Sequence, residues 1–77
     1  MTPERIGEAA GALWRKLHAK GGEGVSLSEL RKLPGFTPDE AIAGIGWLAR
    51  EGKLCFRTNG KRGTVVSLVG EEILASV

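Results

Sequence analysis

Two helix-start signals on either side of a Pro-Gly pair constrain the fold of this 77-residue chain more than any other feature. Residues 26–29 (SLSE) and 37–40 (TPDE) both have the spacing of a capping box, in which a hydroxyl residue and a glutamate each satisfy a free backbone N–H group of the other. In the second box, proline also occupies the first helical position, where its missing N–H group loses no hydrogen bond. The sequence therefore predicts a short helix over about 27–33 and a longer one over about 38–51, joined by a tight turn.

An amphipathic helix precedes this pair. Thr2 followed by Pro3 is an N-cap with proline at the first helical position, and the two glycines after Lys20 favour a left-handed C-terminal cap. We therefore expect a helix over about 3–20, followed by a short extended piece at Val25. One face of this helix is apolar at helical periodicity and is expected to lie in the core: Ile6, Ala9, Ala10, Leu13 and Leu17.

The segment after the third helix is expected to fold back as a hairpin. Residues 53–58 alternate in polarity, residues 64–68 are rich in β-branched side chains, and the Asn-Gly pair between them is a turn signal. The order of elements is then helix, short strand, helix, turn, helix, strand, strand. This predicts an α+β fold, a winged helix-turn-helix, with a three-helix bundle and an antiparallel wing in one domain over 1–77. For residues 70–77 a helical turn and a strand extension both remain open.

The composition excludes several classes of protein. Apolar residues make up 42% of the chain and charged residues 26%, which fits a soluble globular domain. No apolar run approaches the roughly 18 residues of a membrane span, and the charged N-terminus lacks the apolar region of a secretory signal. We therefore expect a cytoplasmic protein without a membrane partner.

The positions of cysteine and histidine in the sequence do not indicate a catalytic or metal-binding site. Cys55 is the single cysteine, so it forms no internal disulfide, and no Cys/His cluster has the spacing of a zinc site. His18 is the single histidine and has no identifiable nucleophile or metal partner. We expect both residues to be structural, and we expect no enzyme activity, no cofactor and no small-molecule ligand.

The positive charge of the chain is concentrated in the predicted hairpin. Residues 53–68 contain four basic residues and no acidic one, whereas residues 37–52 contain three acidic residues and one basic residue. Such asymmetry indicates partners better than the net charge of +2 does. The candidate nucleic-acid-binding residues are Arg57, Lys61, Arg62 and Arg50. Charged hairpin tips also keep sheet edges soluble, so phosphate contact and plain solubility both remain open for the wing.

Two strings resemble a known family. The segments IGEAAGALW (6–14) and IGWLAREGKL (45–54), at this separation, resemble the small stand-alone winged helix-turn-helix proteins of bacteria and archaea, a family catalogued as a domain of unknown function. The resemblance covers about residues 5–68. It implies the winged-helix fold and the nucleic-acid-binding role that usually accompanies it. It implies no enzyme activity and supplies no established binding residues.

The third helix is poorly suited to reading bases. Stepping 100° per residue, its inward arc is expected to hold Ala41, Ile42, Ile45, Gly46, Leu48 and Ala49. Its outward arc is expected to hold Asp39, Glu40, Ala43, Gly44, Trp47, Arg50 and Glu51. The carboxylates at the N-terminal turns suit the helix dipole but would repel phosphates. Arg50, the one basic residue on the outward arc, lies at the C-terminal end. In other helix-turn-helix proteins it is the N-terminal turns that contact base edges.

Trp47 lies opposite the predicted core stripe, beside Ala43 and Gly44. Together the three residues form a candidate protein interface, because small residues let a partner approach and tryptophan is a frequent anchor. Two alternatives remain open: another part of the chain covers Trp47, or its ring stacks on an unpaired base.

Other helical glycines indicate close contacts as well. Gly46 is expected to face the first helix, and Gly7 and Gly11, four residues apart, suggest close backbone approach. Trp14 borders the predicted core stripe and is expected to belong to the core.

These observations support two functions. The first is a DNA-binding or transcription-regulatory module whose basic wing contacts the phosphates of double-stranded DNA. The second is a protein-interaction or homodimerisation module that uses the outward Trp47 face of the third helix.

Overall fold

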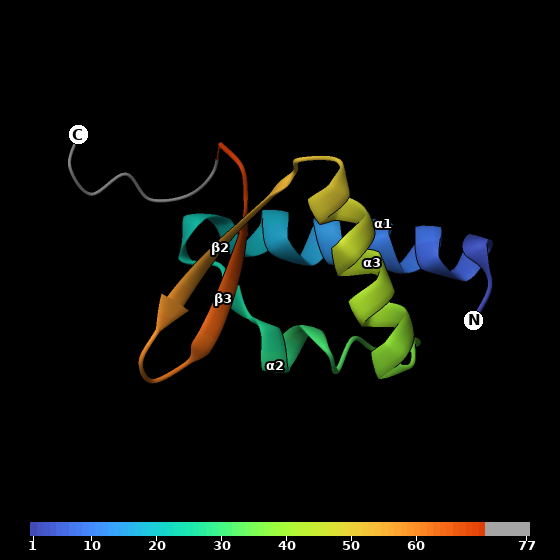
Figure 1. The fold of residues 1–77 in the computed structure, drawn as a ribbon, viewed down its shortest axis with the longest axis horizontal. Helices are drawn as coiled ribbons and strands as arrows, with labels where there is room; N and C mark the ends of the chain where they lie inside the picture. Colours follow the sequence, from blue (N-terminus) through green and yellow to red (C-terminus); the bar gives the residue numbers. More distant parts are fainter. Residues whose placement is uncertain (71–77) are drawn as a thin grey trace.

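The computed structural model describes residues 1–70 of the chain as three helices and a small sheet (Figure 1). The elements are α1 (Pro3–Lys20), the 3-10 turn η1 (Gly21–Glu23), β1 (Val25–Ser26), α2 (Leu27–Leu30), α3 (Pro38–Arg50), β2 (Leu54–Asn59) and β3 (Gly63–Leu68). The predicted α+β winged helix-turn-helix fold is confirmed. From residue 71 onward, the alternatives left open for the C-terminal segment lie outside the described residues. Within the described part, no helix is both long and apolar enough to cross a membrane.

The helix starts follow the capping signals. The hydroxyl of Thr37 accepts a hydrogen bond from Glu40 N at 3.1 Å, and the Glu40 carboxylate accepts one from Thr37 N at 3.0 Å, which completes the capping box. The hydroxyl of Ser26 accepts from Glu29 N at 3.2 Å. However, α2 ends at Leu30, three residues before the predicted end. After Leu30 the backbone hydrogen bonds join residues three apart, as in a 3-10 turn. Pro34 and Gly35, the latter with a positive φ, follow, and neither continues a helix.

The sheet has three antiparallel strands in the order β1-β3-β2, so the short β1 adds a third strand to the wing hairpin. Val66 on β3 pairs with both Val25 on β1 and Phe56 on β2. Val25 and Val66 are buried, whereas Phe56 is 48% exposed. The wing hairpin lies at the end of the molecule opposite the N-terminus (Figure 1).

The core lies mainly between α1 and α3, which cross steeply (Figure 1). Gly44 is the closest point of approach: a Cβ atom there would lie 2.9 Å from Leu13 Cδ1 and 3.0 Å from the backbone nitrogen of Ala10. These distances are shorter than ordinary van der Waals contact, so only glycine fits without movement of α1. The predicted buried stripe of α1 is confirmed except at Ile6, which is half-buried.

The prediction of which face of α3 is buried was partly wrong. The buried residues of α3 are Glu40, Ala41, Gly44, Ile45 and Leu48. Gly44 and Glu40 were expected to face outward but are inside, while Ile42, Gly46 and Ala49 were expected inside but are exposed. The helix is rotated relative to the prediction because the glycine, not a larger apolar side chain, meets α1.

A charged contact holds the N-terminal end of α3 against α1. The guanidinium of Arg5 donates to both carboxylate oxygens of Glu40, at 3.0 and 3.2 Å, and to the carbonyl of Gly35 at 2.6 Å. The same guanidinium lies 4.5 Å from the centre of the Phe36 ring. The hydrogen bonds from Arg5 and from the backbone of Thr37 lower the pKa of the Glu40 carboxyl to about 2. A glutamate can therefore be buried here in its ionised form.

Gly44→Ala is expected to destabilise the fold, because the new methyl group must displace the backbone of α1. Overpacking of this kind reduces the free energy of unfolding by about 1–3 kcal/mol. Gly46→Ala on the same helix is the matched control. Nothing lies within 4 Å of a Cβ atom there, so the better helix propensity of alanine is expected to stabilise the fold, by up to about 1 kcal/mol. Urea unfolding of the two variants measures both effects; equal effects would contradict the close approach at Gly44.

Glu40→Gln is expected to lower the thermal midpoint near neutral pH, because it removes the charge that Arg5 binds. The pKa of Glu40 is depressed from an ordinary value of 4.5 to about 2. The carboxylate therefore contributes stability above about pH 4.5, and this contribution is lost as the pH falls toward about 2. The difference in midpoint between wild type and variant should shrink across that window. A constant difference over the same range, measured by circular dichroism, would show that ionisation of Glu40 does not matter.

Candidate nucleic-acid interface

The wing tip presents two cations on a fixed turn. The side-chain oxygen of Asn59 accepts hydrogen bonds from the backbone nitrogens of Lys61 at 2.9 Å and Arg62 at 3.2 Å, and Gly63 supplies the positive φ, +72°, that closes the loop. Both cationic side chains are exposed. Within residues 1–70, neither is within ion-pair distance of an acidic side chain. Both charges are therefore available to an anionic partner.

Arg57 does not share this position. Its guanidinium donates to the carbonyl of Glu23 at 2.6 Å and approaches that of Gly22 at 3.5 Å, and the residue is half-buried. These carbonyls belong to η1, directly after α1. Arg57 therefore ties the middle of β2 to η1, which directly follows the first helix.

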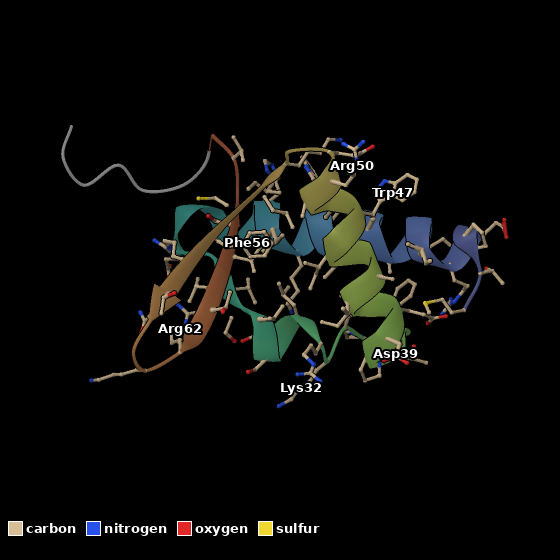
Figure 2. The ribbon with its side chains drawn as sticks, viewed as in Figure 1. Lys32, Asp39, Trp47, Arg50, Phe56 and Arg62 are labelled. Atoms are coloured by element: carbon tan, nitrogen blue, oxygen red, sulfur yellow. The ribbon has the colours of Figure 1, made fainter. Side chains whose placement is uncertain are left out.

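The structure separates Arg50 from the wing and places two other basic residues, Arg31 and Lys32, on the same side as the wing tip. In Figure 2, Arg62 and Lys32 lie along one edge of the molecule, whereas Arg50 lies beside Trp47 at the opposite edge. Arg31 and Lys32 follow α2, which contacts β3, and both are exposed. The candidate interface is therefore formed by two basic residues of the wing tip and two of the turn after α2. We call this set the basic edge: Arg31, Lys32, Lys61 and Arg62.

The exposed face of α3 has little capacity to read bases. Its first turns expose Asp39 and Ile42, its middle exposes Gly46, and its last turn exposes Trp47, Ala49 and Arg50. Base recognition in the major groove requires side chains that donate or accept hydrogen bonds. In the first turns and the middle only the carboxylate of Asp39 does so, and the donors of Trp47 and Arg50 lie at the C-terminal end. Figure 2 places Asp39 on the same side as Lys32, where it would oppose a phosphate. The first and middle turns of α3 are therefore suited to apolar contact, with little sequence information, and not to phosphate contact.

A separate groove lies between α1 and α3. It encloses about 470 Å³ and is lined by Gly7, Ala10, Gly11, Trp14, Arg15, Trp47, Leu48 and Lys53. Trp47 is 54% exposed, so its outward position is confirmed. Trp14 was expected in the core, but it is 39% exposed and stacks on His18, with 4.8 Å between ring centres.

The predicted flat patch of Ala43, Gly44 and Trp47 does not form. Gly44 is buried under α1 and Ala43 is half-buried. Trp47 instead shares the groove with the glycines of α1. The close backbone approach predicted at Gly7 and Gly11 was wrong: within the described chain, a Cβ atom at Gly7 would meet no neighbouring atom within 4 Å, and one at Gly11 would meet only the end of the Arg15 side chain.

No group of three or more potential ligand side chains capable of holding a metal ion occurs in residues 1–70. The Cys55 thiol is half-buried on β2 and forms no disulfide.

Comparison with known proteins agrees with this architecture. The solution NMR structure of protein BT2368 from Bacteroides thetaiotaomicron is similar to this chain, with a TM-score of 0.69 and 26% sequence identity over 91% of this chain and 82% of that one. No curated protein matches the sequence. The family described as a winged helix-turn-helix domain (DUF2582) matches residues 1–67. This chain therefore belongs to the DUF2582 family of winged helix-turn-helix domains.

Proposed function

We propose that this protein is a DNA-binding module, of the kind that serves transcription regulation, which contacts the phosphates of double-stranded DNA mainly through its basic edge. The fold supports a DNA-binding or regulatory role in general. The observation that carries the finer proposal is the pair of exposed cations at the wing tip, Lys61 and Arg62, on a turn fixed by Asn59. A rigid turn presents the charges to a phosphate backbone without a large loss of loop entropy on binding.

The basic edge supplies affinity and the exposed face of α3 supplies little specificity. Phosphate contacts fix the position of a protein on a duplex but carry no sequence information. The exposed apolar side chain of Ile42 can contact a thymine methyl group, whereas Asp39 disfavours close approach of a phosphate. We therefore infer binding with weak sequence preference, whose affinity depends strongly on salt.

Changing Lys61 and Arg62 together to alanine is expected to remove most duplex binding. Each phosphate contact contributes roughly 0.9 to the slope of log affinity against log salt, so the slope should decrease in magnitude by about two. Arg50→Ala is the matched control, because this exposed arginine lies at the opposite edge of the molecule (Figure 2). It should change affinity much less. Fluorescence anisotropy with several unrelated duplexes over a range of salt measures both variants.

Three results would contradict this proposal. The first is no duplex binding at low salt and high micromolar protein. The second is a larger loss of binding from Arg50→Ala than from the double variant. The third is a strong preference for one duplex sequence, which would assign base reading to α3.

A second function is supported by the exposure of Trp47. An indole that is 54% exposed beside a groove is a suitable anchor for another protein surface, and it fits a protein-interaction or homodimerisation role for this side of α3. Trp47→Ala is expected to abolish partner capture or change the oligomeric state while the far-ultraviolet circular dichroism spectrum stays unchanged. Normal capture and an unchanged oligomeric state in this variant would exclude the second function.

A further inference from the structure

The exposed face of α1 has glycines that its own fold does not explain. Gly7 and Gly11 lie inside an 18-residue helix, where glycine is less favourable than alanine. A methyl group at Gly7 would meet open space, and at Gly11 it would meet only the end of the Arg15 side chain, at 3.5 Å. Gly44 differs from these two glycines, because a Cβ atom at Gly44 would clash with α1. On the outer face of α1, the missing side chains instead form part of the groove beside Trp47.

The charges on the same face are segregated along the helix. Glu4 and Glu8 lie in the N-terminal half and Arg15 lies in the C-terminal half, and all three are exposed. Residues 4, 8, 11 and 15 follow one another at spacings of four, three and four, so they form one stripe. In the described part of the chain, neither Glu8 nor Arg15 has an ion-pair partner within 4 Å. A stripe that is acidic at one end and basic at the other is complementary to a reversed copy of itself.

We infer that this face binds a second copy of the chain, with the two α1 helices antiparallel about a two-fold axis beside Gly11. Such an axis places Glu8 of each copy opposite Trp14 of the other copy. Arg15 of that other copy is then only one residue, about 1.5 Å along the helix, from Glu8. Two symmetric Glu8–Arg15 ion pairs then flank a centre where the glycines let the helices approach closely. An isologous pairing of this kind uses the same patch twice and closes as a dimer.

The groove completes the fit. The same axis brings Trp14 of the second copy beside Gly7, next to the exposed ring of Trp47, in a space of about 470 Å³. Each copy thus presents a half-exposed indole and a glycine-lined groove that receives the indole of the other. Aromatic side chains in such pockets dominate the binding energy of many interfaces.

This inference deepens the second proposed function, because it names the partner and the contact. It does not depend on DNA binding. Trp47, which lines the groove, lies at the edge of the molecule opposite Lys32 and Arg62 (Figure 2).

Charge reversal tests the pairing. In sedimentation equilibrium of the full chain, wild type is expected to show a concentration-dependent dimer. Glu8→Arg and Arg15→Glu should each raise the dissociation constant by roughly tenfold or more, because like charges then face each other twice. The double variant, and an equimolar mixture of the two single variants, should restore dimers. Arg31→Glu, a reversal away from this face, should leave the dissociation constant unchanged.

Two glycine variants separate a role in the interface from a role in the fold. Gly7→Ala and Gly11→Leu should raise or preserve the thermal midpoint measured at dilute, monomeric concentration, because a Cβ atom at either site clashes with nothing in residues 1–70 and glycine is the poorer helix former. Both should weaken the dimer, and Gly11→Leu should abolish it. The opposite signs of the two readouts distinguish close approach of a partner from a structural need for glycine.

A chain that stays monomeric at millimolar concentration would overturn the inference. So would a dimer that resists both single reversals, or that fails to recover in the double variant, since its contact would lie elsewhere. A monomer that still captures another protein in a Trp47-dependent manner would overturn self-pairing while leaving the second proposed function in place.

Discussion

The close approach of α1 and α3 over Gly44 is the contact on which the rest of the structure depends. Because no side chain stands between the helices there, the backbone of α3 lies against Ala9 and Ala10. This sets the rotation of α3 about its axis. Glu40 is turned inward to meet Arg5, while Ile42 and Gly46 are turned outward. The same rotation places Trp47 beside the glycines of α1, where it lines the groove.

The wing is held at two points by different means. In the middle of β2, Arg57 donates to carbonyls of η1 and couples the hairpin to the turn after α1. At its tip, the side chain of Asn59 closes the turn that carries Lys61 and Arg62. Arg57, a candidate phosphate ligand in the sequence, thus has carbonyl partners within its own chain, whereas Lys61 and Arg62 stay exposed at the tip.

The molecule keeps its two exposed surfaces of interest at opposite edges. The basic edge combines the wing tip with the turn after α2, and the other edge combines Trp47 with the groove on α1 (Figure 2). Between them, the first and middle turns of α3 expose a single hydrogen-bonding side chain, that of Asp39. The two proposed functions, phosphate contact and protein contact, thus use different edges of the molecule.

Local sequence signals predicted the elements of this fold, and they failed where the outcome depends on residues distant in the chain. Capping boxes, the Asn-Gly turn and the apolar stripe of α1 act within a few residues, so their backbone consequences can be read directly from the sequence. The end of α2 was misplaced by three residues because tightening of the last turn gives no strong sequence signal.

The candidate sites were predicted less well for the same reason. Lys61 and Arg62 lie on a local turn, and their exposure followed from that turn. Arg57 has its partners 34 and 35 residues away, and Glu40 has Arg5 35 residues away, so neither placement could be read from the neighbouring residues.

By itself, the sequence determined where helices and strands begin, which face of α1 is apolar and that the hairpin is basic. Each of these depends on hydrogen bonds and side-chain periodicity within a single element. Only the tertiary structure decided which glycine lies between the helices, which charges are exposed and which tryptophans line a groove. Those outcomes depend on how closely two helices can approach, and a side chain's distance from another element is fixed by packing and not by periodicity.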